Sequence, residues 1–181
     1  MCLGAIFFLA PLKATATKEP LMRVLIGNEI KARFRADGQE FIFVKGISSR
    51  HKRIKSLYIT YNNNKVEYSI NNIKNESFEL PNTFNLVISN SSKRGIWFKN
   101  RRYAGELKVS LNDQRLQIIN YLKLEKYLKS VVGSEMPKEF PLAALQAQAI
   151  AARTYALKSL GNNQLFNVHS TEANQVYLGL E

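Results

Sequence analysis

One carboxylate stands out in the segment GSEMPKEFP at 133–141, where Glu135 lies between chain-breaking and apolar residues. Two interpretations are open. Val131 and Met136 would shield Glu135 from water, and an apolar setting favours the protonated carboxyl that a general acid requires. Alternatively, Ser134 caps a following helix and Glu135 interacts with the positive end of that helix. Its position alone favours the second interpretation.

The other side chains that offer chemistry are scattered. Arg153 falls among alanines, where a guanidinium is costly to bury without an anionic partner, so it either orients Glu135 or holds a substrate oxygen. Alternatively, it is a surface arginine whose stem lies along apolar residues. His169 and Glu172 are too few for a metal site, and Cys2 is the only cysteine. We expect no metal and no cofactor.

The elements that must position these residues begin with a β-rich part at 22–120. Short runs rich in β-branched and aromatic residues predict strands at 22–27, 40–46, 56–61, 66–70, 84–89 and 95–98. The clearest hairpin is YAGELKVSLNDQRLQIIN at 103–120, in which apolar and polar residues alternate and Asn112-Asp113 forms the turn.

At Tyr121 the hydrophobic period becomes helical. Leu124 and Val131 lie on the apolar stripe of a first helix that we expect to end at a left-handed cap on Gly133. A second helix is predicted from Pro141 to about Leu160. Its apolar face, which we expect to be buried, comprises Leu142, Leu145, Ala149, Ala152, Ala156 and Leu160. The predicted fold class is α+β, with a β-rich N-terminal part followed by two packed helices that carry the SEMP motif.

Composition sets the general class. The 181 residues are 45% hydrophobic and 22% charged, which is typical of one globular domain. The 26 basic and 14 acidic residues give a net charge of +12, which favours an anionic partner such as nucleic acid, acidic lipid or an acidic cell-wall polymer. A solvated lysine-rich surface is the simpler explanation. No nucleic acid partner is expected, because the sequence has no RNA-binding aromatic signature and no helix-turn-helix pattern.

The first residues, MCLGAIFFLAPLKATA at 1–16, combine a short apolar run with a small-x-small triplet. This pattern predicts a signal peptide cleaved before Thr17 and a secreted or periplasmic protein of the cell envelope. The run is too short to span a bilayer comfortably, so we expect membrane contact only through an uncleaved N-terminus. A buried N-terminal strand is the alternative.

The run YLKSVVGSEMPKEFPLAALQAQAIAARTYAL at 127–157 resembles the stage II sporulation protein D and amidase-enhancer family. Further similar fragments occur in the same order at 23–27, 103–109, 118–128 and 170–179. The resemblance implies a lytic transglycosylase that cleaves the bond between N-acetylmuramic acid and N-acetylglucosamine in peptidoglycan glycan strands stripped of their peptides. The alternative, from the second branch of the family, is a noncatalytic cell-wall binding protein that enhances a cell-wall amidase.

The resemblance also implies roles for individual residues. Glu135 matches the catalytic glutamate, Arg153 matches the arginine of the helix, and Gln175 and Tyr177 belong to the QVY segment near the cleft. We therefore expect substrate-binding or positioning roles for Arg153, Gln146, Gln148, Tyr155, Gln175 and Tyr177. Many members have lysine in place of Gln146. Sporulation members that bind zinc do so through Cys and His residues near QVY, where this chain has His169 and Asn174, so zinc is not expected.

The resemblance also implies the domain organisation. A domain of this family would span 17–181, with the β-rich part at 22–120, the helical motif at 121–161 and the start of the QVY segment at 162–181. Members of the family continue past this segment, so we expect the chain to be either a fragment or a shortened form that lacks the remainder of the family domain. Without that remainder, the helix at 141–160 would expose apolar surface.

Overall fold

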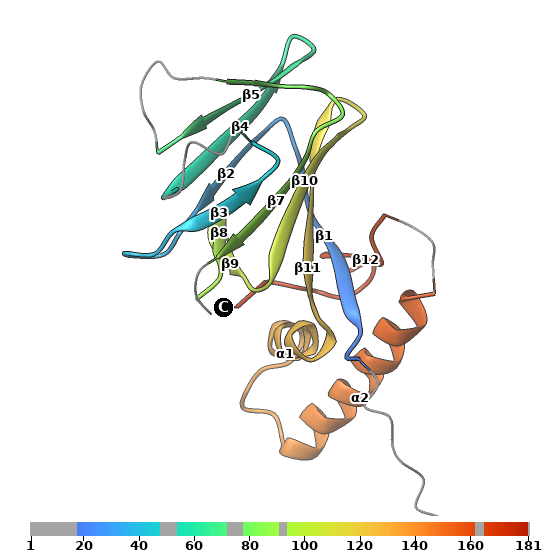
Figure 1. The fold of residues 1–181 in the computed structure, drawn as a ribbon. Coiled ribbons are helices and arrows are strands. Elements are labelled where there is room, and N and C mark those ends of the chain that lie inside the picture. Colours follow the sequence, from blue (N-terminus) through green and yellow to red (C-terminus); the bar gives the residue numbers. More distant parts are fainter. Residues whose placement is uncertain (1–17, 48–53, 72–77, 91–93, 162–164, 181) are drawn as a thin grey trace, which may run out of the picture.

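The computed structural model describes residues 18–47, 54–71, 78–90, 94–161 and 165–180 (Figure 1). The predicted signal peptide at 1–16 lies outside the described residues. The fold is α+β, as predicted, with strands followed by two helices. Neither of these helices is long and apolar enough to cross a membrane.

The described strands form two sheets. The first sheet has the order β12-β1-β11-β10-β7-β3, and the second has the order β6-β5-β4-β2-β8-β9. The strands of the first sheet are β1 (Leu21–Glu29), β3 (Ile42–Lys45), β7 (Asn85–Asn90), β10 (Glu106–Asn112), β11 (Arg115–Lys123) and β12 (Val168–His169). Those of the second are β2 (Lys31–Arg35), β4 (Ser56–Asn62), β5 (Lys65–Ile70), β6 (Phe78–Leu80), β8 (Ile96–Phe98) and β9 (Arg101–Tyr103).

The six predicted strands are all present, and the 103–120 hairpin corresponds to β10 and β11. Its turn lies one residue later than predicted. Asn112 pairs with Arg115, so the loop residues are Asp113 and Gln114, with φ of 48° and 60°. Two consecutive residues at positive φ are typical of a turn that matches the twist of the strands it joins.

Residues of both sheets join in one hydrophobic core. Alternation along each strand decides which side chains enter it. In β2, Ala32 and Phe34 point inward, and the Phe34 ring stacks on Phe98 with 5.3 Å between ring centroids. The residues on either side of them are exposed and basic. The charges in the KARFR run explain why the sequence did not predict this strand.

Helix α1 (Leu124–Glu135) follows β11 directly and packs at one end of the sheets (Figure 1). Its buried stripe consists of Leu124, Tyr127, Leu128 and Val131. The predicted cap at Gly133 is wrong, because the helix continues through Gly133 to Glu135 and the Met136 N–H donates to the Val132 carbonyl at 3.0 Å. Glu135 is therefore the last residue of a helix rather than part of a connection.

Helix α2 (Leu142–Ser159) was predicted to be buried, and this prediction is wrong. In the structure only Ala152 and Ala156 of α2 are buried, whereas Leu142 is 70% and Ile150 is 65% exposed. The reason is its place in the fold. α2 packs beside α1 at the end of the sheets and is not enclosed between two layers (Figure 1).

The C-terminal segment, 165–180, runs back from α2 to the strands. β12 pairs with β1 in parallel, and the Leu180 N–H donates to the Arg102 carbonyl of β9 at 2.8 Å. Gly179 permits this approach, because its φ is +85° and a Cβ there would lie 2.2 Å from the Arg102 carbonyl oxygen. These contacts fix the segment to strands of both sheets.

Candidate functional site

The Glu135 carboxylate lies where α1, α2 and the C-terminal segment meet. The Gln148 side-chain amide, on α2, donates to Oε2 at 2.5 Å. The Val176 backbone N–H, on the C-terminal segment, donates to Oε1 at 3.1 Å. Each carboxylate oxygen of Glu135 therefore accepts a hydrogen bond from a different segment.

This geometry contradicts the capping interpretation of the SEMP motif. α2 begins at Leu142, seven residues after Glu135, and Ser134 lies inside α1. The Ser134 hydroxyl is buried and has no hydrogen-bond partner among the described residues. Glu135 lies at the carboxyl end of α1, where the helix dipole disfavours a negative charge. The two donated hydrogen bonds offset that repulsion.

Gln175 is buried and joins the C-terminal segment to both helices. Its side chain is 5% exposed, so it is covered by the protein and not free to meet a substrate in this arrangement. The Tyr127 hydroxyl donates to Gln175 Oε1 at 2.9 Å, and Gln175 Nε2 donates to the Ala152 carbonyl at 3.4 Å. These bonds connect the C-terminal segment to both helices next to Val176. Burial, reinforced by the nearby Glu135, raises the pKa of Tyr127 well above its ordinary value.

Tyr177 anchors the same segment to the sheets. It is 2% exposed, and its hydroxyl donates to Asn120 Oδ1 at 2.6 Å. The buried Asn120 amide in turn donates to the carbonyls of Ala104 and Glu106 at 2.8 and 3.0 Å. Burial raises the pKa of Tyr177 well above its ordinary value, so the hydroxyl remains a donor.

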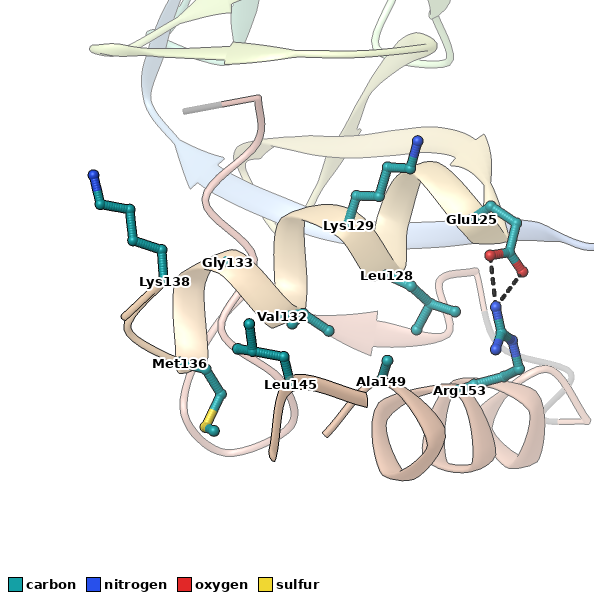
Figure 2. Close-up of a pocket in the computed structure, with 10 residues that line it drawn as sticks. All are labelled: Glu125, Leu128, Lys129, Val132, Gly133, Met136, Lys138, Leu145, Ala149 and Arg153. Atoms are coloured by element: carbon teal, nitrogen blue, oxygen red, sulfur yellow. Dashed lines mark hydrogen bonds and ion pairs between the residues drawn. The ribbon is translucent and has the colours of Figure 1, made fainter. Parts of the chain in front are cut away.

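The structure pairs Arg153 with Glu125 and not with Glu135, so of the alternatives open from the sequence it does not show the one in which Arg153 orients Glu135. Its guanidinium donates to both carboxylate oxygens of Glu125 at 2.6 Å (Figure 2). The last turns of α2 lie beside the first turn of α1, so Arg153 faces Glu125. Gln148, further back on α2, is the residue opposite Glu135.

Of the other predicted site residues, Gln146 is exposed on α2. Tyr155 is 38% exposed, and its hydroxyl accepts a hydrogen bond from the Asn174 amide at 2.8 Å. Asn174 Oδ1 accepts from the His169 backbone N–H at 2.8 Å. Tyr155 therefore orders the C-terminal segment just before Gln175. Of the predicted site residues, Gln148 thus contacts Glu135 directly. Gln175 and Tyr155 hold the C-terminal segment that also contacts Glu135. Gln146 and Arg153 do not contact Glu135 in the structure.

A groove of about 430 Å³ lies between α1 and α2 (Figure 2). Leu128, Val132, Met136, Leu145 and Ala149 give it an apolar floor, the Glu125–Arg153 ion pair lies at one end, and Lys129 and Lys138 extend from its edge. Glu135 does not line this groove. A second hollow of about 480 Å³ is lined by Ser170, Thr171, Glu172, Ala173 and Val176. Val176 thus lines this hollow and also donates its backbone N–H to Glu135.

Several residues of the site were not identified from the sequence. Glu125, Tyr127 and Asn120 were not singled out from the sequence. The donor at Val176 could not be identified from the sequence either, because a backbone N–H is present whatever the residue type. One signal was present for Tyr127. It precedes Glu135 by eight residues on the same helical stripe, so it lies on the face that carries the carboxylate.

The chemistry available at this site is proton transfer. A helix-terminal carboxyl with an amide side chain and a backbone N–H against its oxygens is able to give and accept a proton. The geometry thus defines an α+β protein in which the carboxylate at the end of α1 is held by α2 and by the C-terminal segment. Among the described residues, no three His, Cys, Asp or Glu side chains cluster closely enough to hold a metal ion.

Comparison with known families identifies the protein class further. Residues 112–181, which include β11, both helices and the C-terminal segment, match the family described as stage II sporulation protein. Over this part, the chain matches the stage II sporulation protein D family. No solved structure matches it.

The relatives extend the comparison. The stage II sporulation protein D of Bacillus subtilis is 39% identical over 67 residues, which cover 34% of this chain and 20% of that protein. The protein of the same name from Bacillus amyloliquefaciens is 40% identical over 65 residues. An uncharacterised protein of Brachyspira hyodysenteriae is 32% identical over 142 residues, or 71% of this chain. The chain spans 39% of this last relative and about a fifth of the two Bacillus proteins.

Proposed function

We propose that the protein is a peptidoglycan lytic transglycosylase of the cell envelope, with Glu135 as its acid and base. The observation that carries the proposal is the position of Glu135, which is joined at once to α1, α2 and the C-terminal segment. A carboxyl held at three segments is preorganised for proton transfer. The match to the stage II sporulation protein D family supports the same assignment.

In the proposed reaction, protonated Glu135 gives its proton to the glycosidic oxygen between N-acetylmuramic acid and N-acetylglucosamine. The bond from that oxygen to C1 of the muramic acid breaks, which releases the N-acetylglucosamine hydroxyl. The Glu135 carboxylate then takes the proton of the muramic acid C6 hydroxyl as O6 bonds to C1. The product is a 1,6-anhydro ring, no water is consumed, and Glu135 regains its proton.

Gln148 is suited to support both states of Glu135. Its amide carries a donor and an acceptor, so rotation of the amide lets it donate to the carboxylate or accept from the protonated carboxyl. The structure contains the first arrangement, with Nε2 at 2.5 Å from Glu135 Oε2. Glu139 lacks such support, because its side chain is 70% exposed and its ion-pair partner is the neighbouring Lys138 at 3.9 Å.

The test is product analysis. The purified protein is incubated with glycan strands freed of peptide stems, and the products are examined by mass spectrometry. The expected products carry 1,6-anhydromuramic ends, and the Glu135→Gln variant is expected to lose them while retaining its fold by circular dichroism. If the folded variant released these ends as fast as wild type, the role of Glu135 would be refuted.

A second candidate function is a noncatalytic cell-wall protein that enhances an amidase. The observation that favours it is that both oxygens of Glu135 are already engaged by internal donors, as expected of a structural clamp. The apolar groove between α1 and α2 is a surface of the kind that binds protein partners. On this account Glu135→Gln would still stimulate a cell-wall amidase, and neither wild type nor variant would release anhydro ends.

A further inference from the structure

A row of cations crosses the outer face of the second sheet, away from the helices that hold Glu135. Strand alternation places Lys31, Arg33 and Arg35 of β2 on the exposed side. In the neighbouring strands, Tyr58 lies directly opposite Arg33 and Trp97 lies opposite Arg35. Alternate residues of a strand are about 6.7 Å apart, so the three cations repeat at that spacing. We name Lys31, Arg33, Arg35, Tyr58 and Trp97 the basic face.

The basic face is hollowed. A cavity of about 550 Å³ opens there, lined by Lys31, Ala32, Arg33, Arg35, Tyr58, Phe98, Lys99 and Asn100. Lys99 pairs with Glu29 at 2.6 Å, which offsets its charge. Within the described part of the chain, no acidic side chain forms an ion pair with Lys31, Arg33 or Arg35. The cavity therefore presents an uncompensated positive charge.

Trp97 indicates what kind of anion fits. The guanidinium carbons of Arg35 and Arg102 each lie 5.4 Å from the centroid of its ring. The indole N–H donates to Asp37 Oδ1 at 3.3 Å. A ring held by two cations is not free to stack on nucleic acid bases, which single-strand binding requires. The face therefore suits a polyanion that lacks bases.

We propose that the basic face binds a linear, phosphodiester-linked polymer without bases, as a second binding site separate from Glu135. Arginine is the side chain best suited to phosphate, because its planar donors match the phosphate oxygens, and the strand repeat offers one cation to each successive charge. The proposal does not depend on the reaction at Glu135. It assigns part of the +12 net charge to one defined surface.

The experiment uses the natural reporter in this face. Trp97 is the only tryptophan of the chain, and the guanidinium of Arg35, which lines the cavity, lies over its ring, so Trp97 fluorescence reports on a change at Arg35. The protein is titrated with poly(glycerol phosphate) at several salt concentrations. Binding is expected to change Trp97 fluorescence and to weaken as salt rises. The plot of log affinity against log salt concentration should have a slope steeper than about −2, because each phosphate contact contributes about −0.7 and three contacts are expected.

Two charge-matched triple variants complete the test. Lys31→Gln, Arg33→Gln and Arg35→Gln together are expected to weaken binding by about tenfold or more and to flatten the salt slope by about 2. The control is a triple variant made elsewhere, Lys45→Gln, Lys126→Gln and Lys158→Gln, for which a change below about twofold is expected.

Four outcomes would overturn the proposal. These are absence of binding, unchanged Trp97 fluorescence on binding, an equal loss of affinity in both triple variants, and binding of a single-stranded oligonucleotide as tight as that of poly(glycerol phosphate). A fifth outcome, binding of polyglutamate of equal charge as tight as that of poly(glycerol phosphate), would refute the selectivity for phosphate.

Discussion

The two helices that meet at Glu135 are held in the protein in different ways. α1 buries a continuous stripe from Leu124 to Val131, whereas α2 buries only Ala152 and Ala156. The sequence suggests the reverse, because α2 is the more apolar helix. The difference shows that apolar content does not decide burial. A helix is buried where other elements surround it, and α2 lies at the end of the sheets with much of its surface open.

This contrast matters for the site. Glu135 belongs to the firmly packed helix, and its partner Gln148 belongs to the exposed one. The position of Gln148 therefore depends on a few contacts of α2, together with the C-terminal segment that Tyr177 anchors. Substitutions at α1 and its supports should affect the whole fold, while most substitutions on α2 should not.

The largest effect is expected at Tyr177, whose ring packs on Tyr127 of α1 with 5.4 Å between centroids. Tyr177→Ala should lower the free energy of unfolding by about 3–5 kcal/mol, because it leaves a cavity and removes the hydroxyl donated to Asn120. Urea denaturation measures this. The matched change on α2, Leu142→Ala, should stay within about 0.5 kcal/mol because Leu142 is 70% exposed. If both variants lost the same free energy of unfolding, the contrast between the firmly packed α1 with its supporting segment and the exposed α2 would be refuted.

Alkaline pH should reduce the contribution of Tyr127 and Tyr177 to the free energy of unfolding. The folded-state pKa values of Tyr127 and Tyr177 are raised above their ordinary value of 10.0, so each stays protonated in the folded protein while it ionises in the unfolded chain. Their contribution is complete below pH 10 and is lost as pH rises above it, at about 1.4 kcal/mol per pH unit for each tyrosine. Urea denaturation at pH 9, 10 and 11 measures the loss, and Tyr177→Phe should show a shallower decline. An identical slope in that variant would contradict the assignment.

Within α2, neighbouring alanines should respond differently. Ala152 is 2% exposed and its carbonyl accepts from Gln175, so Ala152→Leu should cost about 1–3 kcal/mol through overpacking. Ala151 is exposed, and Ala151→Leu should be almost neutral. Thermal melts of the two variants make the comparison. If both changes were neutral, the packing of α2 on the C-terminal segment would be refuted.

The smallest effect is expected from the ion pair between the helices. Glu125 and Arg153 have side chains that are 54% and 42% exposed, so their coupling should be about 0.2–1 kcal/mol. A double-mutant cycle with Glu125→Gln and Arg153→Met measures it, and the coupling should shrink at high salt. A coupling several times larger would mean that this pair, and not the Tyr177 anchor, fixes α2.

Much of this fold was predictable from local pattern. The alternation in β10 and β11 and the helical stripe of α1 are encoded residue by residue, and both are present in the structure. The cap at Gly133 was not predictable with the same certainty. A glycine caps a helix in this way only where it adopts the left-handed conformation itself, and Gly133 has no positive φ and lies inside α1.

The sequence indicated the residue at the centre of the candidate site but only some of the residues that contact it. The SEMP segment indicated Glu135, and the helical motif that follows it contains Gln148. The partner of Arg153 was not evident, because it depends on how α1 and α2 align. The Val176 N–H was not evident either, since a backbone donor depends on the path of the C-terminal segment rather than on its residue types.

The most direct test of the account is a kinetic comparison of two neighbouring glutamates. The rate at which 1,6-anhydro ends form on denuded glycan strands is measured for wild type, Glu135→Gln and Glu139→Gln. The account predicts a loss of about 100-fold or more for Glu135→Gln, because general acid–base catalysis contributes about 10²–10⁴. Glu139→Gln should match wild type, since its carboxylate is solvated. Equal rates for all three proteins would contradict the central claim that Glu135 transfers the proton.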